Sequence, residues 1–302
     1  MGADLHCHTR LSDGSMGIDN LIVLAKKQGI GTIAITDHDC LAGNVRGKRI
    51  GEQYGIRVLP GVELSATDHK RGTKAHLLCY LPDSPDRLEG LCRRNLLESK
   101  KASQYMIVKT AVQYPVTPDF IIKCAAGSTG VYKQHIAHAL MESGLTERIF
   151  GDLYMELFSA GSEKNVLREP DHPEPGDILA AIHDAGGIAV LAHPVLYNNM
   201  ELLDELIEQG LDGVEVWHPS ADAETVERLQ KIAKKNGLLM TGGSDFHGMY
   251  GVGSVSIGTC LTPDEHLDAL LSYKARKRRK LARAAKAAER EAAETQAQQA
   301  EK

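Results

Sequence analysis

Residues 4–14 read DLHCHTRLSDG, an apolar run that carries two histidines separated by one residue. In an extended strand alternate side chains share a face, so His6 and His8 are expected to project together. Leu5 and Cys7 are then expected to project to the opposite face. Two imidazoles on one face make a ready metal site, although such a pair alone is equally compatible with a structural or incidental role.

Short apolar runs that end in turn residues continue along the chain and alternate with helical patterns. They predict strands over residues 4–8, 31–36, 56–61, 75–81, 187–193, 212–218, 237–243 and 253–258. Amphipathic patterns predict helices over residues 18–28, 178–184, 200–209 and 223–235. This mostly parallel α/β pattern favours a (β/α) barrel or an open doubly wound sheet.

The alternation stops between residues 85 and 175, where helical patterns appear without a convincing strand. We therefore expect a barrel built in two parts, residues 1–84 and 176–273, with a helical insertion over residues 85–175 that caps the substrate. The last part, residues 274–302, is rich in Ala, Lys, Arg, Glu and Gln. It is predicted to form a solvated helix or a disordered tail that does not pack on the core.

The composition is typical of a cytoplasmic protein. The chain has 302 residues, enough for a sizeable core, and its six cysteines form no CxxC pair. No stretch has the pattern of a secretion signal or a membrane span. The net charge is −5, but the tail is basic, so residues 1–271 carry about −11. An acidic body rich in metal-ligating side chains suits cation binding better than polyanion binding.

Histidines and carboxylates recur where the predicted strands end. Asp13 follows the turn LSDG, and the stretches ITDHD, PGVELSA, VLAHP and GGSDFHG contain His38, Glu63, His193, Asp245 and His247. The carboxyl ends of parallel strands meet at one mouth, so we expect a multinuclear metal site there. Each residue also has an ordinary alternative, since a lone histidine is commonly satisfied or exposed, and Asp13 or Glu63 could cap a helix.

A carboxylate such as Glu63 can bridge two metal ions. A hydroxide held between such ions is a nucleophile at neutral pH, because coordination lowers the pKa of water to about 7. Nitrogen and oxygen ligands without thiolate suit Mn, Fe or Zn. Asp37 and Asp39 flank His38 and are expected to orient the ligand imidazoles from outside the metal shell.

The stretches DLHCHTRLSDG, AITDHD, GVELSA, VLAHP, DGVEVWHPS and LLMTGGSDFHG together resemble the polymerase and histidinol phosphatase (PHP) family of metal-dependent phosphoesterases. The resemblance runs from about residue 4 to 259 in the family's order. It implies a distorted seven-stranded, TIM-like (β/α) barrel with two or three divalent ions, Mn first and Fe, Zn or Mg as alternatives. The implied ligands are His6, His8, Asp13, His38, Glu63, His76, His193, Asp245 and His247. His76 stands at the start of its apolar run and depends mainly on this resemblance.

Within the family the chain is most similar to the branch that has a helical insert and acts on nucleotides. The insert motif of that branch, RPHIARAL, reads KQHIAHAL here, so Lys133 replaces a phosphate-binding Arg and His138 replaces a second Arg. Lysine keeps the charge but loses the bidentate fork. The resemblance implies substrate contacts by Lys133, His135 and His218. Lys133 could instead be a solvated surface lysine, and His218 could merely shape the turn that follows it.

The predicted function is hydrolysis of nucleotide phosphomonoesters, foremost a nucleoside 3',5'-bisphosphate to its 5'-monophosphate, with short RNA as a further substrate. A metal-bridging hydroxide is expected to attack phosphorus, with Glu63, His193 and Asp245 as the ligands that activate it. The alternatives are a histidinol-phosphatase-like or other small phosphomonoesterase, and an amidohydrolase, although the expected mid-chain lysine is missing. An alternative of another class is a nucleic-acid-binding module with a vestigial site, suggested by the basic run KARKRRKLARAAK. The expected partner is a phosphorylated small molecule, and no membrane is expected.

Overall fold

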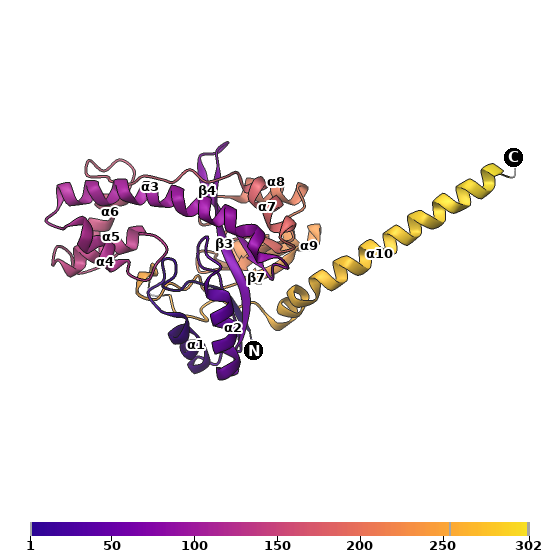
Figure 1. The fold of residues 1–302 in the computed structure, drawn as a ribbon, viewed down its shortest axis with the longest axis horizontal. Helices are drawn as coiled ribbons and strands as arrows, with labels where there is room; N and C mark the ends of the chain where they lie inside the picture. Colours follow the sequence, from indigo (N-terminus) through magenta and orange to yellow (C-terminus); the bar gives the residue numbers. More distant parts are fainter. Residues whose placement is uncertain (1, 254, 301–302) are drawn as a thin grey trace.

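Seven strands follow one another around a single sheet in the order β1-β2-β3-β4-β5-β6-β7 (Figure 1). The strands are β1 (Ala3–Cys7), β2 (Thr32–Ile35), β3 (Arg57–Asp68), β4 (Thr73–Tyr80), β5 (Ile188–Leu191), β6 (Gly213–Trp217) and β7 (Leu239–Gly242). This computed structural model describes residues 2–253 and 255–300, and for residues 281 and 284–300 it describes the backbone alone.

β4 runs antiparallel to both of its neighbours, β3 and β5, whereas the other strand pairs are parallel. Residues 69–72 alone connect β3 to β4, and this connection is too short for the crossover that parallel neighbours need. Gly72 has a φ of 67° in this turn, a conformation that favours glycine. The start of β4 therefore lies at the same edge of the barrel as the ends of β3 and β5.

The segment that follows β7 closes the barrel against β1. The backbone N–H of His8 donates to the carbonyl of Phe246 at 2.9 Å, and that of Ala3 donates to the carbonyl of Thr262 at 2.9 Å. Gly243 makes the tightest approach, since a Cβ placed there would lie 2.3 Å from the Cβ of His6. The predicted seven-stranded α/β barrel is thus confirmed, and it is nearly closed.

An irregularity in β1 separates side chains that strict alternation would place together. The register of β1 with β2 shifts between Asp4 and Cys7. Leu5 packs inside the barrel with Leu78, whereas Cys7 packs on the outer face with Leu21 of the following helix. The expectation that Leu5 and Cys7 share a face is therefore wrong, because a bulge interrupts the alternation.

Helices cover the outer face of the barrel. On the β1–β3 side they are α1 (Ile18–Lys27) and α2 (Gly43–Tyr54); on the β3–β7 side they are α7 (Pro175–Asp184), α8 (Met200–Glu208) and α9 (Ala223–Asn236). Leu267 and Leu270 of α10 (Asp264–Ala300) join the apolar cluster inside the barrel. These leucines leave the opposite mouth of the barrel to the polar side chains described below.

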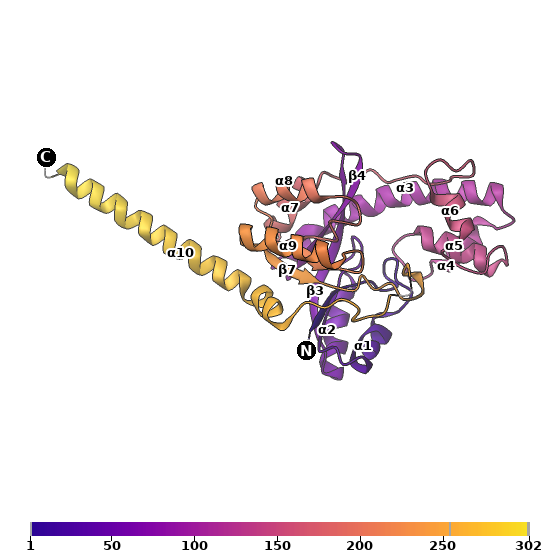
Figure 2. The same ribbon diagram turned by 180° about the vertical axis from the view of Figure 1, so that it is seen from behind.

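Between β4 and α7 the chain forms a helical unit with an apolar core of its own. Its helices are η1 (Pro85–Leu88), α3 (Glu89–Gln113), α4 (Pro118–Cys124), α5 (Lys133–Glu142) and α6 (Asp152–Phe158). Ile121, Ile136 and Leu157 are fully buried in that core. Figures 1 and 2 show α4, α5 and α6 gathered beside α3, to one side of the barrel. The predicted domain boundaries themselves stay a prediction.

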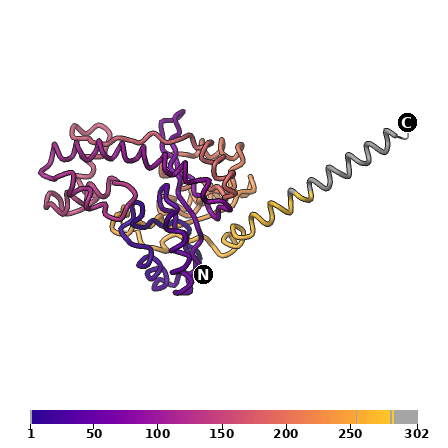
Figure 3. The backbone as a smooth tube through the Cα atoms, viewed as in Figure 1, coloured from indigo at the N-terminus to yellow at the C-terminus, as the bar shows by residue number. Residues whose placement is uncertain are grey.

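α10 runs without a break into the predicted tail and contacts the body there. Lys274 pairs with Asp83 at 2.9 Å, and Lys277 pairs with the buried carboxylate of Asp212 at 2.8 Å. The expectation of a tail without contacts therefore fails at its first turn, because these lysines meet acidic side chains of the barrel. Directly past these contacts the coloured part of the helix runs away from the body (Figure 3). Residues 301–302 of the predicted tail lie outside the described residues. None of the described helices, α10 included, combines the length and apolar character needed to cross a membrane.

Two strand predictions are corrected by the structure. β3 does not end near residue 61 but continues to Asp68, because β4 pairs with its whole second half. The predicted strand over residues 253–258 is not a strand in its described part, from which residue 254 is excluded. Instead, the N–H of Gly258 donates to Oδ2 of Asp4 at 2.8 Å and ties this segment to β1.

Replacing Gly243 by alanine tests the closure of the barrel. The added Cβ would lie 2.4 Å from the backbone nitrogen of His6, so β1 or the segment after β7 must move. We expect Gly243→Ala to lower the free energy of unfolding by about 1–3 kcal/mol, the usual cost of overpacking, in urea denaturation. Gly90→Ala in α3 is the matched control, because nothing lies within 4 Å of its added Cβ. Equal stability of the two variants would contradict the tight closure.

Candidate metal centre

Nine histidine and carboxylate side chains meet at one mouth of the barrel. They are the predicted ligands His6, His8, Asp13, His38, Glu63, His76, His193, Asp245 and His247. His76 lies near the start of β4, yet it pairs across the sheet with Ser65, close to the end of β3. Because β4 is antiparallel to β3, a histidine early in its strand joins residues from the ends of the parallel strands.

Glu63 of β3 occupies the centre of this group and is only 1% exposed. Its Oε1 lies 2.9 Å from Nδ1 of His76 and 2.9 Å from Nε2 of His193. Its Oε2 lies close to the ring nitrogens of His6 (3.2 Å), His8 (3.1 Å) and His38 (3.3 Å). The two oxygens of one carboxylate thus face two separate sets of imidazoles, which is the arrangement of a bridging ligand.

The potential ligand atoms form three overlapping groups, and in each group all of them lie within 4.8 Å of one another. The groups are His6, His8, Glu63 and Asp245; His38, Glu63 and His76; and His8, Asp13, His38 and His247. Glu63, His8 and His38 each belong to two groups. His193 stands outside these three groups, but its contact with Glu63 places it beside His76.

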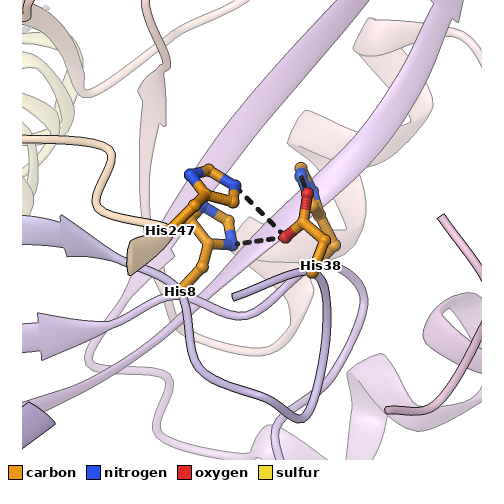
Figure 4. A group of neighbouring side chains, drawn as sticks. His8, His38 and His247 are labelled. Atoms are coloured by element: carbon orange, nitrogen blue, oxygen red, sulfur yellow. Dashed lines mark ion pairs between the residues drawn. The ribbon is translucent and has the colours of Figure 1, made fainter. Parts of the chain in front are cut away.

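Asp13 returns a carboxylate to the mouth, as its turn predicts. Its Oδ1 lies 3.2 Å from Nε2 of His247 and 3.4 Å from Nδ1 of His8 (Figure 4). Nε2 of His38 lies 3.8 Å from the other oxygen, Oδ2. The side chain of Gln134, at the start of α5, donates to this same Oδ2 at 2.8 Å. The helical insertion therefore reaches the metal centre directly.

Several buried polar atoms at this centre have no hydrogen-bonding partner among the residues that the structure describes. They are Nε2 of His6, Nε2 of His8, Nδ1 of His38, Oε2 of Glu63 and Nδ1 of His193. Leaving a buried polar atom unpaired is costly, and proteins pair nearly all of them. Imidazole nitrogens combined with carboxylate oxygens are a donor set that divalent transition metals bind. These residues therefore fit a cluster of divalent metal ions.

The protonation of the centre fits metal binding as well. Burial opposes ionisation of Glu63, but the imidazoles of His38 and His6 hold its pKa well below the ordinary value. Burial lowers the pKa of His38 to about 3, so this ring is neutral and able to bind a metal. Burial also disfavours the charged form of His8, yet the nearby carboxylates of Asp245 and Glu63 raise its pKa to about 10. A bound cation would take over the charge balance that this proton provides.

Glu215 of β6 orients two of the histidines and was not predicted. Its Oε1 lies 2.9 Å from Nδ1 of His6, which leaves Nε2 of that ring to face the centre. Its Oε2 accepts the backbone N–H of His193 at 2.8 Å. This bond supports a strained residue, since His193 has a φ of 25°. The available signal was a carboxylate in the middle of an otherwise apolar strand pattern, GVEVW, where an ionisable side chain needs a partner.

Asp37 and Asp39 tie neighbouring segments together, and Asp37 also reaches a ligand imidazole through a third residue. Asp37 accepts the N–H and the hydroxyl of Thr9, both at 2.7 Å. Asp39 accepts the hydroxyl of Ser65 at 2.7 Å and the side-chain amide of Asn95 at 2.7 Å. Asp37 reaches a ligand imidazole through Ser12, whose hydroxyl donates to Asp37 at 2.7 Å and lies 3.4 Å from Nδ1 of His8. The expectation that Asp39 orients an imidazole is not met by its contacts, which are to side chains of β3 and α3.

A cavity of about 500 Å³ opens above the centre, between the barrel mouth and the insertion. Lys133 and His218 line it, and Nε2 of His218 lies 3.4 Å from Oδ2 of Asp245. His135 does not line it: this residue is only 2% exposed, and its Nδ1 accepts the N–H of Tyr132 at 3.1 Å. The structure thus gives His135 the place of a cap on the helix that begins at Lys133, because its ring turns back toward the chain.

The cavity also contains polar side chains that the sequence reasoning missed, namely Lys74, Gln134 and Arg168. Lys74 stands two residues before His76 on β4 and therefore shares its face, so the sequence did contain a signal for it. Gln134 and Arg168 belong to the insertion, and their positions depend on how that unit folds against the barrel.

A family model described as PHP domain matches residues 4–160, more than half of the chain. The chain belongs to the PHP domain family. The family resemblance seen in the sequence is therefore confirmed.

Relatives of this PHP-domain protein have names that refer to phosphate esters. The chain is 34% identical over 251 residues to phosphoribosyl 1,2-cyclic phosphate 1,2-diphosphodiesterase of Eggerthella lenta. This match covers 82% of the chain and 95% of the relative. It is 28% identical over 251 residues to 3',5'-nucleoside bisphosphate phosphatase of Chromobacterium violaceum, with 81% and 86% covered. The crystal structure of a protein from Bifidobacterium adolescentis, inferred to be a metal-dependent phosphoesterase, matches at a TM-score of 0.80 and 32% identity, with 90% and 96% covered. The predicted enzyme class agrees with all three.

Removing the charge of Glu215 tests its role in holding the centre. Glu215→Gln keeps the shape of the side chain but removes the carboxylate that faces Nδ1 of His6. We expect the affinity for Mn to fall about 10- to 100-fold, the usual effect of losing such a partner. Titration calorimetry and the metal content after dialysis measure this change. Glu224→Gln, on the exposed start of α9, is the control. Unchanged Mn affinity in Glu215→Gln would limit Glu215 to a role in folding.

Proposed function

We propose that this protein is a metal-dependent phosphoesterase that hydrolyses a phosphate ester on a ribosyl compound. The first candidate substrate is a nucleoside 3',5'-bisphosphate, which would give the 5'-monophosphate. The observation that carries this proposal is the convergence of the nine predicted ligands, with Glu63 at their centre, at the floor of a cavity large enough for a nucleotide. The relatives named above support a phosphorylated ribosyl substrate, since both curated names contain such a unit.

The predicted ligands would hold two or three divalent ions, with Mn as the first choice and Fe, Zn or Mg as alternatives. Bound ions would lower the pKa of coordinated water and polarise the phosphoryl oxygens. Glu63 would bridge two of the ions, while His193 and Asp245 complete their surroundings. The strained backbone of Asp245, with a φ of 49°, is held where two histidines contact its Oδ1.

Lys133 is the proposed clamp for the phosphoryl oxygens. It is half-buried at the first turn of α5 and lines the cavity rather than the outer surface. A cation held there stabilises negative charge that develops on the phosphoryl group during the reaction. His218 directly follows β6 and lies beside Asp245. It would contact the substrate from that side of the cavity. His135 would act only by fixing the start of α5.

A second candidate reaction is the opening of a cyclic ribosyl phosphate. The observation that favours it is the higher identity to the E. lenta diphosphodiesterase, 34% against 28% for the bisphosphate phosphatase. In both reactions the attack is on the phosphorus of a phosphate ester of ribose. Both need the metal ligands at the floor of the cavity. They differ in the ester that is cleaved, so a direct comparison of substrates separates them.

Hydrolysis of a panel of esters tests the proposed function, with phosphate release as the readout for the monoesters and product chromatography as the readout for the RNA and the cyclic ester. The panel contains a nucleoside 3',5'-bisphosphate, AMP, a short 5'-phosphorylated RNA, histidinol phosphate and a cyclic ribosyl phosphate. We expect the protein, stripped of metal and reloaded with Mn, to turn over the bisphosphate selectively and to lose this activity on chelation. Activity that survives exhaustive metal removal would sink the proposal. A metal-loaded protein that hydrolyses no ester but binds RNA would favour the nucleic-acid-binding alternative.

Replacing Lys133 tests the phosphate clamp. We expect Lys133→Met to lower kcat/KM for the hydrolysed ester about 10- to 100-fold, the cost of losing a charged hydrogen bond. Lys133→Arg should retain most of the activity, because the charge is kept. Lys123→Met, on the exposed face of α4, is the matched control. Equal kinetics of Lys133→Met and Lys123→Met would show that Lys133 is an ordinary solvated lysine.

A further inference from the structure

Two cationic side chains line the cavity, are not among the candidate metal ligands at its floor, and have no part in the reaction described above. We propose that Lys74 and Arg168 form a second anion subsite, which holds a phosphate that is not hydrolysed and so selects ribosyl substrates with two phosphates. This inference rests on the proposed function and specifies which member of the substrate class the cavity prefers.

The position of Lys74 follows from the β3–β4 hairpin. Glu63, Ser65 and Thr67 lie on one face of β3, and they pair in register with Leu78, His76 and Lys74 of β4. Lys74 thus continues the row that begins at the metal floor, two residues beyond His76. Two residues of strand span about 7 Å, which is comparable with the length of one ribose unit. A phosphate bound at Lys74 can therefore belong to the same sugar as an ester held over the metals.

Arg168 reaches the cavity from the segment that follows α6. Arg168 is among the cavity-lining residues, and its guanidinium lies over the ring of Tyr105 of α3, an exposed residue of the insertion, at 5.5 Å from the ring centre. Stacking on an aromatic face restrains a guanidinium while its N–H groups remain free to bind a phosphate in a bidentate manner. An arginine in this place supplies the fork that Lys133 lacks.

Glu169 balances the charge of Lys74 when no ligand is bound. Nζ of Lys74 lies 2.5 Å from Oε2 of Glu169, and the two side chains are 33% and 46% exposed. An ion pair this open to solvent is worth at most about 1 kcal/mol, so a phosphate dianion can compete with it. With Lys133 nearby, the four charged side chains of this part of the cavity sum to a positive charge.

The charges around Lys133 also indicate an anion site in the cavity wall. Burial lowers the pKa of its ammonium group, and the nearby Lys74 lowers it further. Two ammonium groups that oppose each other in this way are relieved by an anion between them. This part of the cavity wall, above the candidate metal ligands, is therefore suited to bind a phosphate group.

Two substrates that differ in one phosphate test the subsite. We would measure kcat/KM for a nucleoside 3',5'-bisphosphate and for the nucleoside 3'-monophosphate, using the full chain loaded with Mn. In the wild type we expect the bisphosphate to be preferred. In Lys74→Met and in Arg168→Met we expect this preference to fall about 10- to 100-fold. Lys101→Met, an exposed residue of α3 that pairs with Glu98, should keep the wild-type preference.

Binding of ribose 5-phosphate, measured by titration calorimetry, separates the two levels of the inference. If the wild type hydrolyses no ester but binds ribose 5-phosphate, and Lys74→Met weakens that binding, the proposed function fails and the subsite stands. If the wild type hydrolyses both nucleotides equally well, the subsite is refuted while the phosphoesterase stands. A loss of both substrates to the same degree in Lys74→Met would also overturn the subsite, because it would indicate a purely structural role.

Discussion

The buried carboxylate of Glu63 and the five imidazoles around it are the constraint on which the rest of the structure depends. A buried charge is tolerated only where opposite charges or strong hydrogen bonds surround it. Here the partners come from β1, β4 and the segments after β2 and β5, so none of these elements can shift alone. Their buried, unpaired ring nitrogens and the unpaired oxygen of Glu63 are suited to bind cations, so the barrel mouth can support metal chemistry.

Closure of the barrel holds this arrangement in place. β1 carries His6 and leads directly into His8, and it is bound on one side by β2 and on the other by the segment after β7. Gly243 permits that close approach, while Glu215 of β6 fixes the ring of His6 across the barrel mouth. The reversal of β4 adds His76 from a direction that a purely parallel barrel could not supply. The contacts that stabilise the fold of this protein therefore also set the geometry of its candidate metal ligands.

The helical insertion converts an open mouth into a cavity. Its loop before α5 is bonded to the loop after β1, where the N–H of Thr129 donates to the carbonyl of Leu11 at 2.9 Å. Gln134 then reaches Asp13 itself. The parts that would recognise a substrate, Lys133 and Arg168, are thereby placed at a set distance from the parts that would hold metals. The residues proposed to recognise a phosphate and those proposed to hold the metals therefore lie on backbone segments that are connected by hydrogen bonds.

The sequence by itself determined the family, the barrel, and the chemical types of the candidate ligands, because strand ends that converge on one mouth can be read from local patterns. It also marked Asp13 and His247, whose turns are local. The tertiary structure alone decided the rest. A hairpin of four residues reverses β4, which brings in Lys74 and explains why His76, indicated in the sequence mainly by the family resemblance, lies at the mouth. A long-range contact makes Glu215 the partner of His6, and the packing of the insertion turns His135 into a cap. Such outcomes depend on which distant segments meet, and a one-dimensional pattern does not contain that information.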